Sequence, residues 1–245
     1  LELNPKNPSI INNIAKVYFD MDKFDLAEKY CLKALKMNAN DGNIKKILSL
    51  IYLRKQNYKD GWLFFDGRLN LSDFVERNTS INNIRKKLLK SNKVKDDSNI
   101  LIIREQGVGD EILYGTMYAD LLKKWKNVTI ECDKRLINIF QNAFMDKKDS
   151  FVEMGSVSNN IKYLNKYDHV IYAGSLGKFF RNKIDDFSDG QFLFADEVQI
   201  TNFKKELKNL PKKYNIGISW KSFKNRYANE KSLGLEDFKY LFQTD

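Results

Sequence analysis

A glycine-rich turn, Glu105 to Asp110, has the residue types of a ligand-binding corner. An apolar run precedes the turn and a helical pattern follows it. Gly107 and Gly109 can adopt positive φ angles and let another molecule approach the backbone. The start of the following helix offers unpaired N–H groups and a positive dipole end. The spacing therefore predicts a strand, a turn and a helix that hold a polar ligand, with the Asp110 carboxylate facing it.

The segment Gly107 to Ile112 differs from two common phosphate-binding motifs. Ile112 stands where the dinucleotide fingerprint needs its third small residue, and no Gly-Lys-Ser/Thr follows as a P-loop requires. Aspartate is also favoured at the N-cap of a helix. The residues alone leave two interpretations of Asp110 open: a ligand-facing carboxylate and a helix cap.

A second polar cluster follows the apolar run at 214–220, which we expect to be a strand. At a strand end, cations and a hydroxyl can gather around a diphosphate leaving group and stabilise its charge. A solvated turn is the alternative interpretation. The cluster comprises Lys221, Ser222, Lys224, Arg226 and Lys231.

The apolar run at 167–173 brings two further candidates. His169 lies inside the run and is interpreted as a packed strand residue rather than a base. Ser175 follows in a glycine-rich turn and either contacts an acceptor or belongs to an ordinary turn. The single histidine and the two cysteines, Cys31 and Cys132, show no tetrahedral metal-ligand spacing, so no metal is expected. The cysteines are expected to be buried, as in a protein of a reducing compartment.

The elements that must position the glycine turn form an alternating pattern from residue 98 onward. Short apolar runs are separated by amphipathic segments, which implies a doubly wound parallel sheet of the α/β class. Ligands of such sheets bind at the carboxyl ends of the strands. The predicted strands are 100–104, 128–132, 151–154 and 169–173, and the predicted helices are 111–125 and 134–143.

The first 70 residues repeat at a spacing of 34. This pattern resembles the tetratricopeptide repeat, in which small residues let paired helices cross closely. The resemblance implies helices over 4–21, 24–37, 41–55 and 58–69. About two such units bury too little apolar surface alone, so further repeats are expected before Leu1. The matched pairs are Ile14 with Leu48, Ala15 with Ser49, Tyr18 with Tyr52, Phe24 with Tyr58, and Ala27 with Gly61.

An aromatic and cationic patch closes the repeats. It is interpreted as a seal between the repeats and the next domain, with acceptor docking as the alternative. The patch consists of Trp62, Phe64, Phe65 and Arg68.

The net charge of +10 is concentrated in one segment, because residues 77–95 carry seven Lys and Arg and no acid. A solvated helix face is favoured over an anionic membrane surface, and nucleic acid is the least favoured partner. A helix over 81–89 is expected within this basic connector. No apolar run approaches the roughly 18 residues of a transmembrane helix.

The end of the chain has the pattern of a second α/β unit. Pro211 ends a predicted helix at 201–210, the strand at 214–220 follows, and a helix is expected over 235–242. One strand and one helix do not form a domain, so we expect a longer protein. The expected organisation is repeats at 1–70, the basic connector at 71–97, an α/β domain at 98–212 and the start of another at 213–245.

Four ordered segments together resemble bacterial tetratricopeptide-repeat proteins with a glycosyltransferase domain related to the heptosyltransferases. The turn at 105–110 is the most specific of them. The others are Gly61 to Leu69, Gln191 to Asp196, and Ile216 to Trp220 with Asn225-Arg226 and Lys231-Ser232-Leu233.

The resemblance implies an inverting glycosyltransferase of the two-domain GT-B kind. Its first α/β domain holds the acceptor and its second holds the nucleotide sugar. Asp110 matches the family's proposed catalytic base, which would take the proton of the acceptor hydroxyl. The acceptor-side candidates are Gly107, Gly109 and Ser175, and the donor-phosphate candidates are Lys221, Ser222 and Lys231.

The same resemblance implies a nucleotide sugar as co-substrate, no metal and a cytoplasmic location with peripheral membrane contact as an option. The repeats would dock a protein or glycan acceptor or a partner protein. Because a fold does not guarantee activity, a non-catalytic adaptor with a degenerate transferase domain is the alternative. The 245 residues alone are expected to be inactive, since most of the donor domain would lie beyond Asp245.

Overall fold

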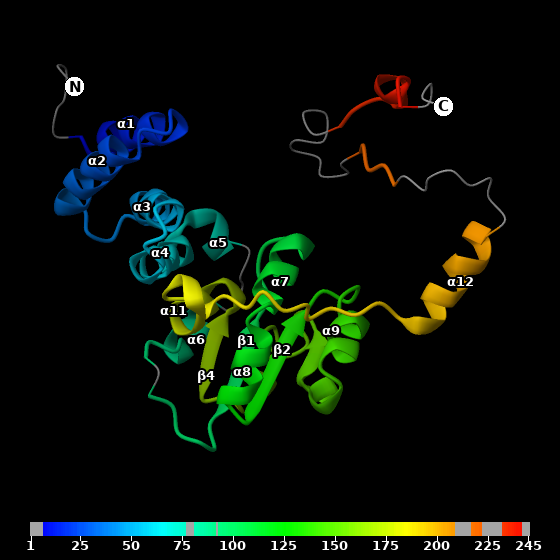
Figure 1. The fold of residues 1–245 in the computed structure, drawn as a ribbon. Helices are drawn as coiled ribbons and strands as arrows, with labels where there is room; N and C mark the ends of the chain where they lie inside the picture. The colour runs from blue at the N-terminus through cyan, green and yellow to red at the C-terminus, as the bar shows by residue number, and fades with distance from the viewer. Residues whose placement is uncertain (1–6, 77–80, 92, 209–216, 222–231, 242–245) are drawn as a thin grey trace. The chain divides into compact units, whose positions relative to one another are not determined.

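A computed structural model describes residues 7–76, 81–91, 93–208, 217–221 and 232–241 (Figure 1). Backbone contacts divide the chain into two compact units, Leu1–Phe194 and Ala195–Asp245. The first unit contains helices followed by a parallel sheet, which confirms the predicted combination of a helical part and an α/β part. No helix within the described ranges is both long and apolar enough to cross a bilayer.

Four helices form the amino-terminal helical array. Polar side chains begin two of them: Asn7 accepts the N–H of Ser9 (2.9 Å), and Asp41 accepts those of Asn43 (2.9 Å) and Ile44 (3.1 Å). These caps satisfy N–H groups that have no partner within the helix. The helices are α1 (Pro8–Asp20), α2 (Phe24–Met37), α3 (Gly42–Arg54) and α4 (Tyr58–Phe65), in agreement with the predicted series of four.

Small residues lie where these helices cross. Ala15 and Ala27 are fully buried, and Ser49, which the 34-residue spacing pairs with Ala15, is buried too. A Cβ atom added to Gly61 would lie 2.7 Å from the Leu53 side chain, so glycine is needed for that close approach. The core around these crossings consists of Ile11, Ala15, Ala27, Cys31, Ala34, Ile44, Leu48 and Ile51.

The connector after the array packs against the sheet, where the Leu89 N–H donates to the Val170 carbonyl (2.9 Å). Arg85 donates a hydrogen bond to the Leu69 carbonyl (3.1 Å), and Lys87 donates one to the Tyr167 carbonyl (2.7 Å). Two of the clustered cations therefore bind protein carbonyls. The 3₁₀ helix η1 (Asp66–Asn70) closes the array, and the connector contains the short helices α5 (Ser72–Glu76) and α6 (Ile81–Lys87).

Four parallel strands form one sheet in the order β3-β2-β1-β4. The central strand β1 pairs on one side with β2 and on the other with β4, so Ile102 lies opposite both Ile130 and Ile171. All four predicted strands are confirmed. Their bounds are β1 (Asn99–Ile103), β2 (Asn127–Cys132), β3 (Phe151–Glu153) and β4 (His169–Tyr172).

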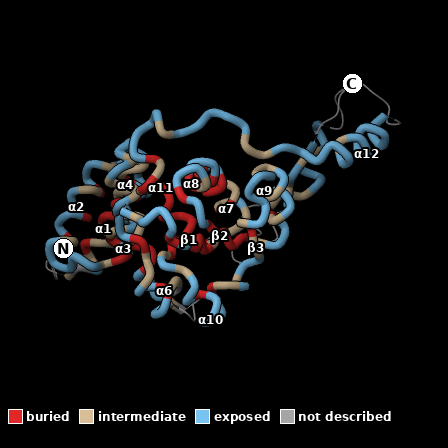
Figure 2. The backbone as a smooth tube through the Cα atoms, turned by 90° about the horizontal axis from the view of Figure 1, so that it is seen from below, coloured by how far each residue is buried: buried red, intermediate tan, exposed pale blue. Residues whose placement is uncertain are grey.

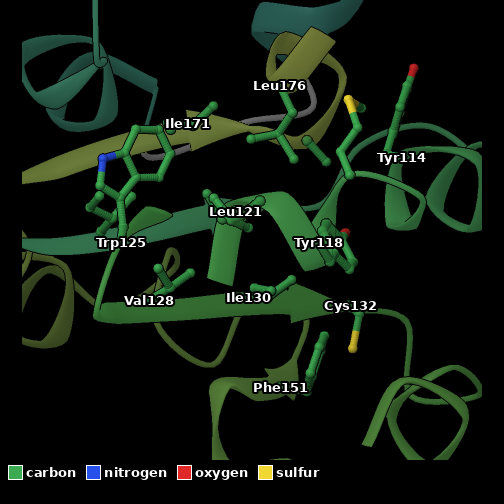
Figure 3. Close-up of a cluster of buried hydrophobic side chains, with 14 of the residues drawn as sticks. Tyr114, Tyr118, Leu121, Trp125, Val128, Ile130, Cys132, Phe151, Ile171 and Leu176 are labelled. Atoms are coloured by element: carbon green, nitrogen blue, oxygen red, sulfur yellow. The ribbon is translucent and has the colours of Figure 1, made fainter. Parts of the chain in front are cut away.

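Apolar cores cover both faces of the sheet, because alternate residues of β1 point in opposite directions. Ile100 and Ile102 belong to one core, and Leu101 and Ile103 belong to the other. Figure 3 shows Tyr118, Leu121 and Trp125 packed over the first of these faces. The helices of the first core are α7 (Val108–Gly115), α8 (Tyr118–Lys124) and α9 (Ile137–Ala143). Figure 2 shows buried stretches along β1 and β2 and also in the array helices and α8, whereas α12 (Glu197–Lys208) is largely exposed.

The predicted single helix over 111–125 is wrong, since α7 and α8 are separate. Thr116 donates its hydroxyl to the Leu113 carbonyl (2.7 Å), which satisfies a carbonyl at the end of α7 without a further helical turn. The break lets Met117 and Tyr118 enter the core, where both are buried.

Short helical turns complete the first unit. They are η2 (Met145–Ser150), α10 (Ile161–Leu164), η3 (Ala173–Leu176), α11 (Gly177–Phe180) and η4 (Ile184–Asp186). Phe192 follows them and packs against the same core as Phe144, at a ring-centroid distance of 6.3 Å.

The second unit contains α12 (Glu197–Lys208) and the 3₁₀ helix η6 (Leu235–Phe238). The strand predicted at 214–220 is not present over its described residues, 217–220, and its first part lies outside the described residues. A strand exists only where a neighbouring strand accepts and donates its backbone hydrogen bonds. In the described part of this segment, the Trp220 carbonyl accepts the Leu233 N–H (2.9 Å).

Candidate functional site

The candidate site lies where the loops after β1 and β4 meet. The chain passes from β1 to β2 and β3 on one side and then returns to add β4 on the other side of β1. The loops after β1 and β4 therefore leave the sheet from neighbouring strands and lead to opposite sides. Doubly wound sheets bind ligands at the carboxyl ends of two such strands. The glycine turn after β1 and the Gly174 to Gly177 turn after β4 both begin there.

The glycine turn has a different backbone from the predicted one. Gln106, not a glycine, adopts the left-handed conformation, with φ of 63°. Gly107 has φ of −98°, and Gly109 lies within α7. Gln106 is held in this strained conformation because its amide donates to the Tyr114 hydroxyl (3.0 Å) and its carbonyl accepts from Arg104 (3.0 Å).

Gly109 keeps the space beside the turn open. A Cβ atom added to Gly109 would meet no atom within 4 Å, and the residue is exposed. The backbone there is accessible to another molecule, although this accessibility does not depend on a positive φ.

Asp110 lies in the first turn of α7, and the interpretation of Asp110 as the N-cap is wrong. Gly107 occupies the N-cap, and the Asp110 carboxylate accepts the Gly107 N–H through Oδ2 (3.0 Å). The same local arrangement occurs at η6, where Asp237 accepts the Gly234 N–H (2.8 Å). Asp110 is only half-buried, so its carboxylate combines this capping contact with access to solvent.

Glu105, the first residue of the glycine turn, joins the turn to two distant segments. It is buried and accepts hydrogen bonds from Arg68, through Nε (2.8 Å) and Nη2, and from the Gly174 N–H (2.6 Å). Burial alone would lower the pKa of Arg68, but the Glu105 carboxylate raises it above its usual range. The pair is thus a charged, bidentate contact between the helical array and the sheet.

Ser175 is directed inward rather than toward an open cleft. It is buried, donates its hydroxyl to Asp66 (2.5 Å) and accepts a hydrogen bond from Arg68 (3.0 Å). Lys178 completes this group by binding Asp66 (2.6 Å). The predicted acceptor contact by Ser175 would therefore require these bonds to open.

The aromatic patch at the close of the array has the predicted sealing position. The Phe65 ring lies 4.3 Å from the Arg68 guanidinium, and Trp62 lies against Gly177. Phe64 instead packs in the array core beside Tyr52.

Glu111 is a buried site residue that the motif reasoning missed. Its carboxylate lies 2.5 Å from Arg104 Nε and accepts the Asp133 N–H (2.9 Å). Burial raises the pKa of Glu111, and the Asp133 N–H and Arg104 oppose that shift. An acidic residue one position after the turn, where the helix faces the sheet, was the available signal.

The remaining predicted positions lie outside the turn at 105–110. His169 begins β4 opposite Ile100, as expected for a strand residue. Lys221 is exposed in the second unit, whereas Ser222 and Lys231 lie outside the described residues.

Within the described ranges, no group of three or more His, Cys, Asp and Glu side chains is arranged to hold a metal. Cys31 and Cys132 are buried and unpaired, as predicted.

Comparisons with known proteins show similarity to a distant relative. No protein-family model matches the chain, and no solved structure matches it. The chain is 21% identical over 238 residues to Protein FlbA of Caulobacter vibrioides. The match covers 91% of this chain but only 39% of that protein. The chain thus spans about two fifths of the length of its relative.

Proposed function

We propose that this chain is the acceptor-side part of an inverting GT-B glycosyltransferase, in which Asp110 is the general base. Its helical array would consist of tetratricopeptide repeats and dock the protein or glycan acceptor, and a nucleotide sugar would be the donor. The protein would work in the cytoplasm. The observation that carries the proposal is the position of Asp110: a half-buried carboxylate beside the open backbone of Gly109, at the reversal point of a parallel sheet.

In the proposed reaction, the Asp110 carboxylate takes the proton of an acceptor hydroxyl. The hydroxyl oxygen forms a bond to the anomeric carbon of the sugar while the bond to the nucleoside diphosphate breaks, which inverts that carbon. The diphosphate leaves with the bonding electron pair. Lys221, Ser222 and Lys231 are the proposed groups that stabilise this charge, so no metal is needed.

The decisive experiment compares two aspartate variants of the full-length gene product. Asp110→Asn keeps an oxygen that can accept the Gly107 N–H but removes the base. We expect sugar transfer to fall by roughly 100-fold or more, as after loss of a general base, with nucleotide-sugar binding unchanged. The assay measures nucleoside diphosphate release from a panel of nucleotide sugars, with an extract of cells that lack the gene as the acceptor source.

Asp186→Asn is the matched control. The half-buried Asp186 carboxylate accepts the Lys183 N–H (3.1 Å) at the start of η4, as the Asp110 carboxylate accepts the Gly107 N–H at the start of α7. Transfer by Asp186→Asn should equal that of the wild type. Unchanged transfer by Asp110→Asn would remove Asp110 from the mechanism.

One observation favours the alternative, a non-catalytic adaptor. Glu105 and Ser175, two polar residues at the reversal point, are both bound to the end of the array. A protein that served only as a scaffold would need such contacts and no open acceptor site. The adaptor proposal predicts no diphosphate release with any donor of the panel, and retained binding of nucleotide sugars would argue against it.

A further inference from the structure

Arg68 joins three segments that are far apart in the sequence. Its guanidinium binds Glu105 in the loop after β1, Ser175 in the turn after β4, and the carbonyl of Phe65 (3.0 Å) at the end of α4. Arg68 itself belongs to η1, the last turn of the helical array. The array therefore reaches both loops of the candidate site through one side chain.

Burial makes each charge of this contact depend on its protein partners. Arg68 is 5% exposed and Glu105 is 7% exposed, so each has lost most of its water, and Arg68 also binds the Asp66 carboxylate (3.2 Å). A Cβ atom added to Gly174 would lie 2.6 Å from Glu105 and 3.0 Å from Arg68. The turn after β4 is thus closed around the ion pair, and a larger residue would have to displace it.

The anchored residue is also close to the proposed base. Glu105 is followed directly by Gln106, whose left-handed backbone starts the turn, and then by Gly107, whose N–H binds Asp110. The link from Arg68 to Asp110 thus runs through two hydrogen-bonded contacts and a short piece of strained backbone. Movement of Glu105 would move the turn and alter the position of the Asp110 carboxylate.

We propose that Arg68 is a positioning residue, through which the end of the helical array holds the turn at 105–110 in its binding geometry. The end of the array would then hold the site in place, in addition to the acceptor docking proposed for the array. The proposal deepens the glycosyltransferase function and rests on it for its catalytic meaning. The coupling of η1 to the turn can be tested whether or not the protein transfers sugar.

Hydrogen exchange in the full-length protein tests the coupling without an activity assay. Arg68→Lys keeps the charge and loses the bidentate contact. We expect the amides of Gly107 and Gly174 to exchange about tenfold faster or more, as after loss of a charged hydrogen bond, while those of β2 remain unchanged. Ser175→Ala, which removes no charge, should give a smaller change at the same two amides.

Arg181→Lys is the control for general destabilisation. Arg181 is also a buried arginine, but it binds Asp120 (2.7 Å) and the Thr116 carbonyl (2.8 Å), at the opposite end of α7 from the turn. Its variant should leave exchange at Gly107 and Gly174 unchanged. The proposal is overturned if Arg68→Lys and Ser175→Ala accelerate those amides no more than Arg181→Lys does.

Kinetics separates this proposal from the proposed function. If the wild type transfers sugar, Arg68→Lys should lower kcat by about tenfold and leave the KM for the nucleotide sugar unchanged, as expected for a shifted base. An equal kcat in the wild type and Arg68→Lys would overturn the positioning role. If the wild type transfers no sugar, the glycosyltransferase proposal fails, and the exchange data still decide whether η1 and the turn are coupled.

Discussion

The helical array and the sheet domain bury different kinds of side chain. Between residues 7 and 65, the buried positions of the described chain are apolar or small, and Ser49 is the polar exception. The sheet domain also buries Glu105, Glu111 and Glu131, all at or near the carboxyl ends of β1 and β2. Each of these carboxylates is held by cations, N–H groups or a hydroxyl, as buried charges require.

This contrast shows that the two regions have different sources of stability. Close helix crossings at small residues hold the array together, so apolar volume decides its stability. Specific polar contacts organise the carboxyl edge of the sheet, so charge pairing decides the geometry there. The ion pair of Arg68 with Glu105 links the two regions.

Breaking that link should have the largest effect. Arg68→Met leaves Glu105 buried without its cation, and we expect a loss of about 3–5 kcal/mol in the free energy of unfolding, measured by urea titration. The double variant Arg68→Met with Glu105→Gln should recover part of the loss, because the uncompensated charge is gone. If the loss in the double variant equals the sum of the losses in Arg68→Met and Glu105→Gln alone, the two residues do not interact.

Overfilling a helix crossing should have the next largest effect. Ala27→Leu inserts a larger side chain at a fully buried position between helices, and we expect a loss of about 1–3 kcal/mol in the free energy of unfolding. Lys33→Leu adds an apolar side chain on the exposed face of the same helix and should change stability little. Equal losses in the two variants would contradict the proposed dependence of the array on small residues.

The two cysteines, one in each region, report on the comparison without any substitution. Burial, together with Glu28 near Cys31 and Glu111 near Cys132, raises the pKa of each thiol to about 12. At pH 8 both should react with iodoacetamide at least ~1000-fold more slowly in the native protein than after unfolding, because the thiolate is scarce and buried. Mass spectrometry of labelled peptides measures each site.

The urea dependence of that labelling sharpens the comparison. In the wild type, Cys31 and Cys132 should become reactive at the same urea concentration, since they belong to one compact unit. In Arg68→Met the two midpoints should separate. Separate midpoints in the wild type would show that the array and the sheet unfold independently.

Local patterns predicted much of the fold. The helix at Phe24–Met37 and the strands at 128–132 and 169–173 agree with the observed bounds to within one residue, because apolar periodicity directly reflects which face is buried. The predictions were wrong where apolar periodicity did not decide the backbone conformation. The helix predicted over 111–125 ends at Gly115, where the Thr116 hydroxyl binds the Leu113 carbonyl, and the apolar run at 214–220 has no strand over its described residues.

The candidate site was predicted only in part. The glycine turn, Asp110 and Ser175 were recognised from the sequence, and the strand order brings the loops that carry them to one edge of the sheet. Their contacts were not predictable, because Arg68 and Glu105 are 37 residues apart and Arg68 and Ser175 are 107 apart.

The sequence by itself determined the helical array, the alternation of strands and helices, and the place of the turn, since each depends on neighbouring residues and their periodicity. Only the tertiary structure decided that β4 lies beside β1, that Gln106 takes the left-handed conformation and that Glu105 binds the end of the array. These features depend on pairings between distant segments. A buried charge is stable only beside a partner with suitable geometry that is also shielded from water. Neither condition can be predicted from the pattern of neighbouring residues.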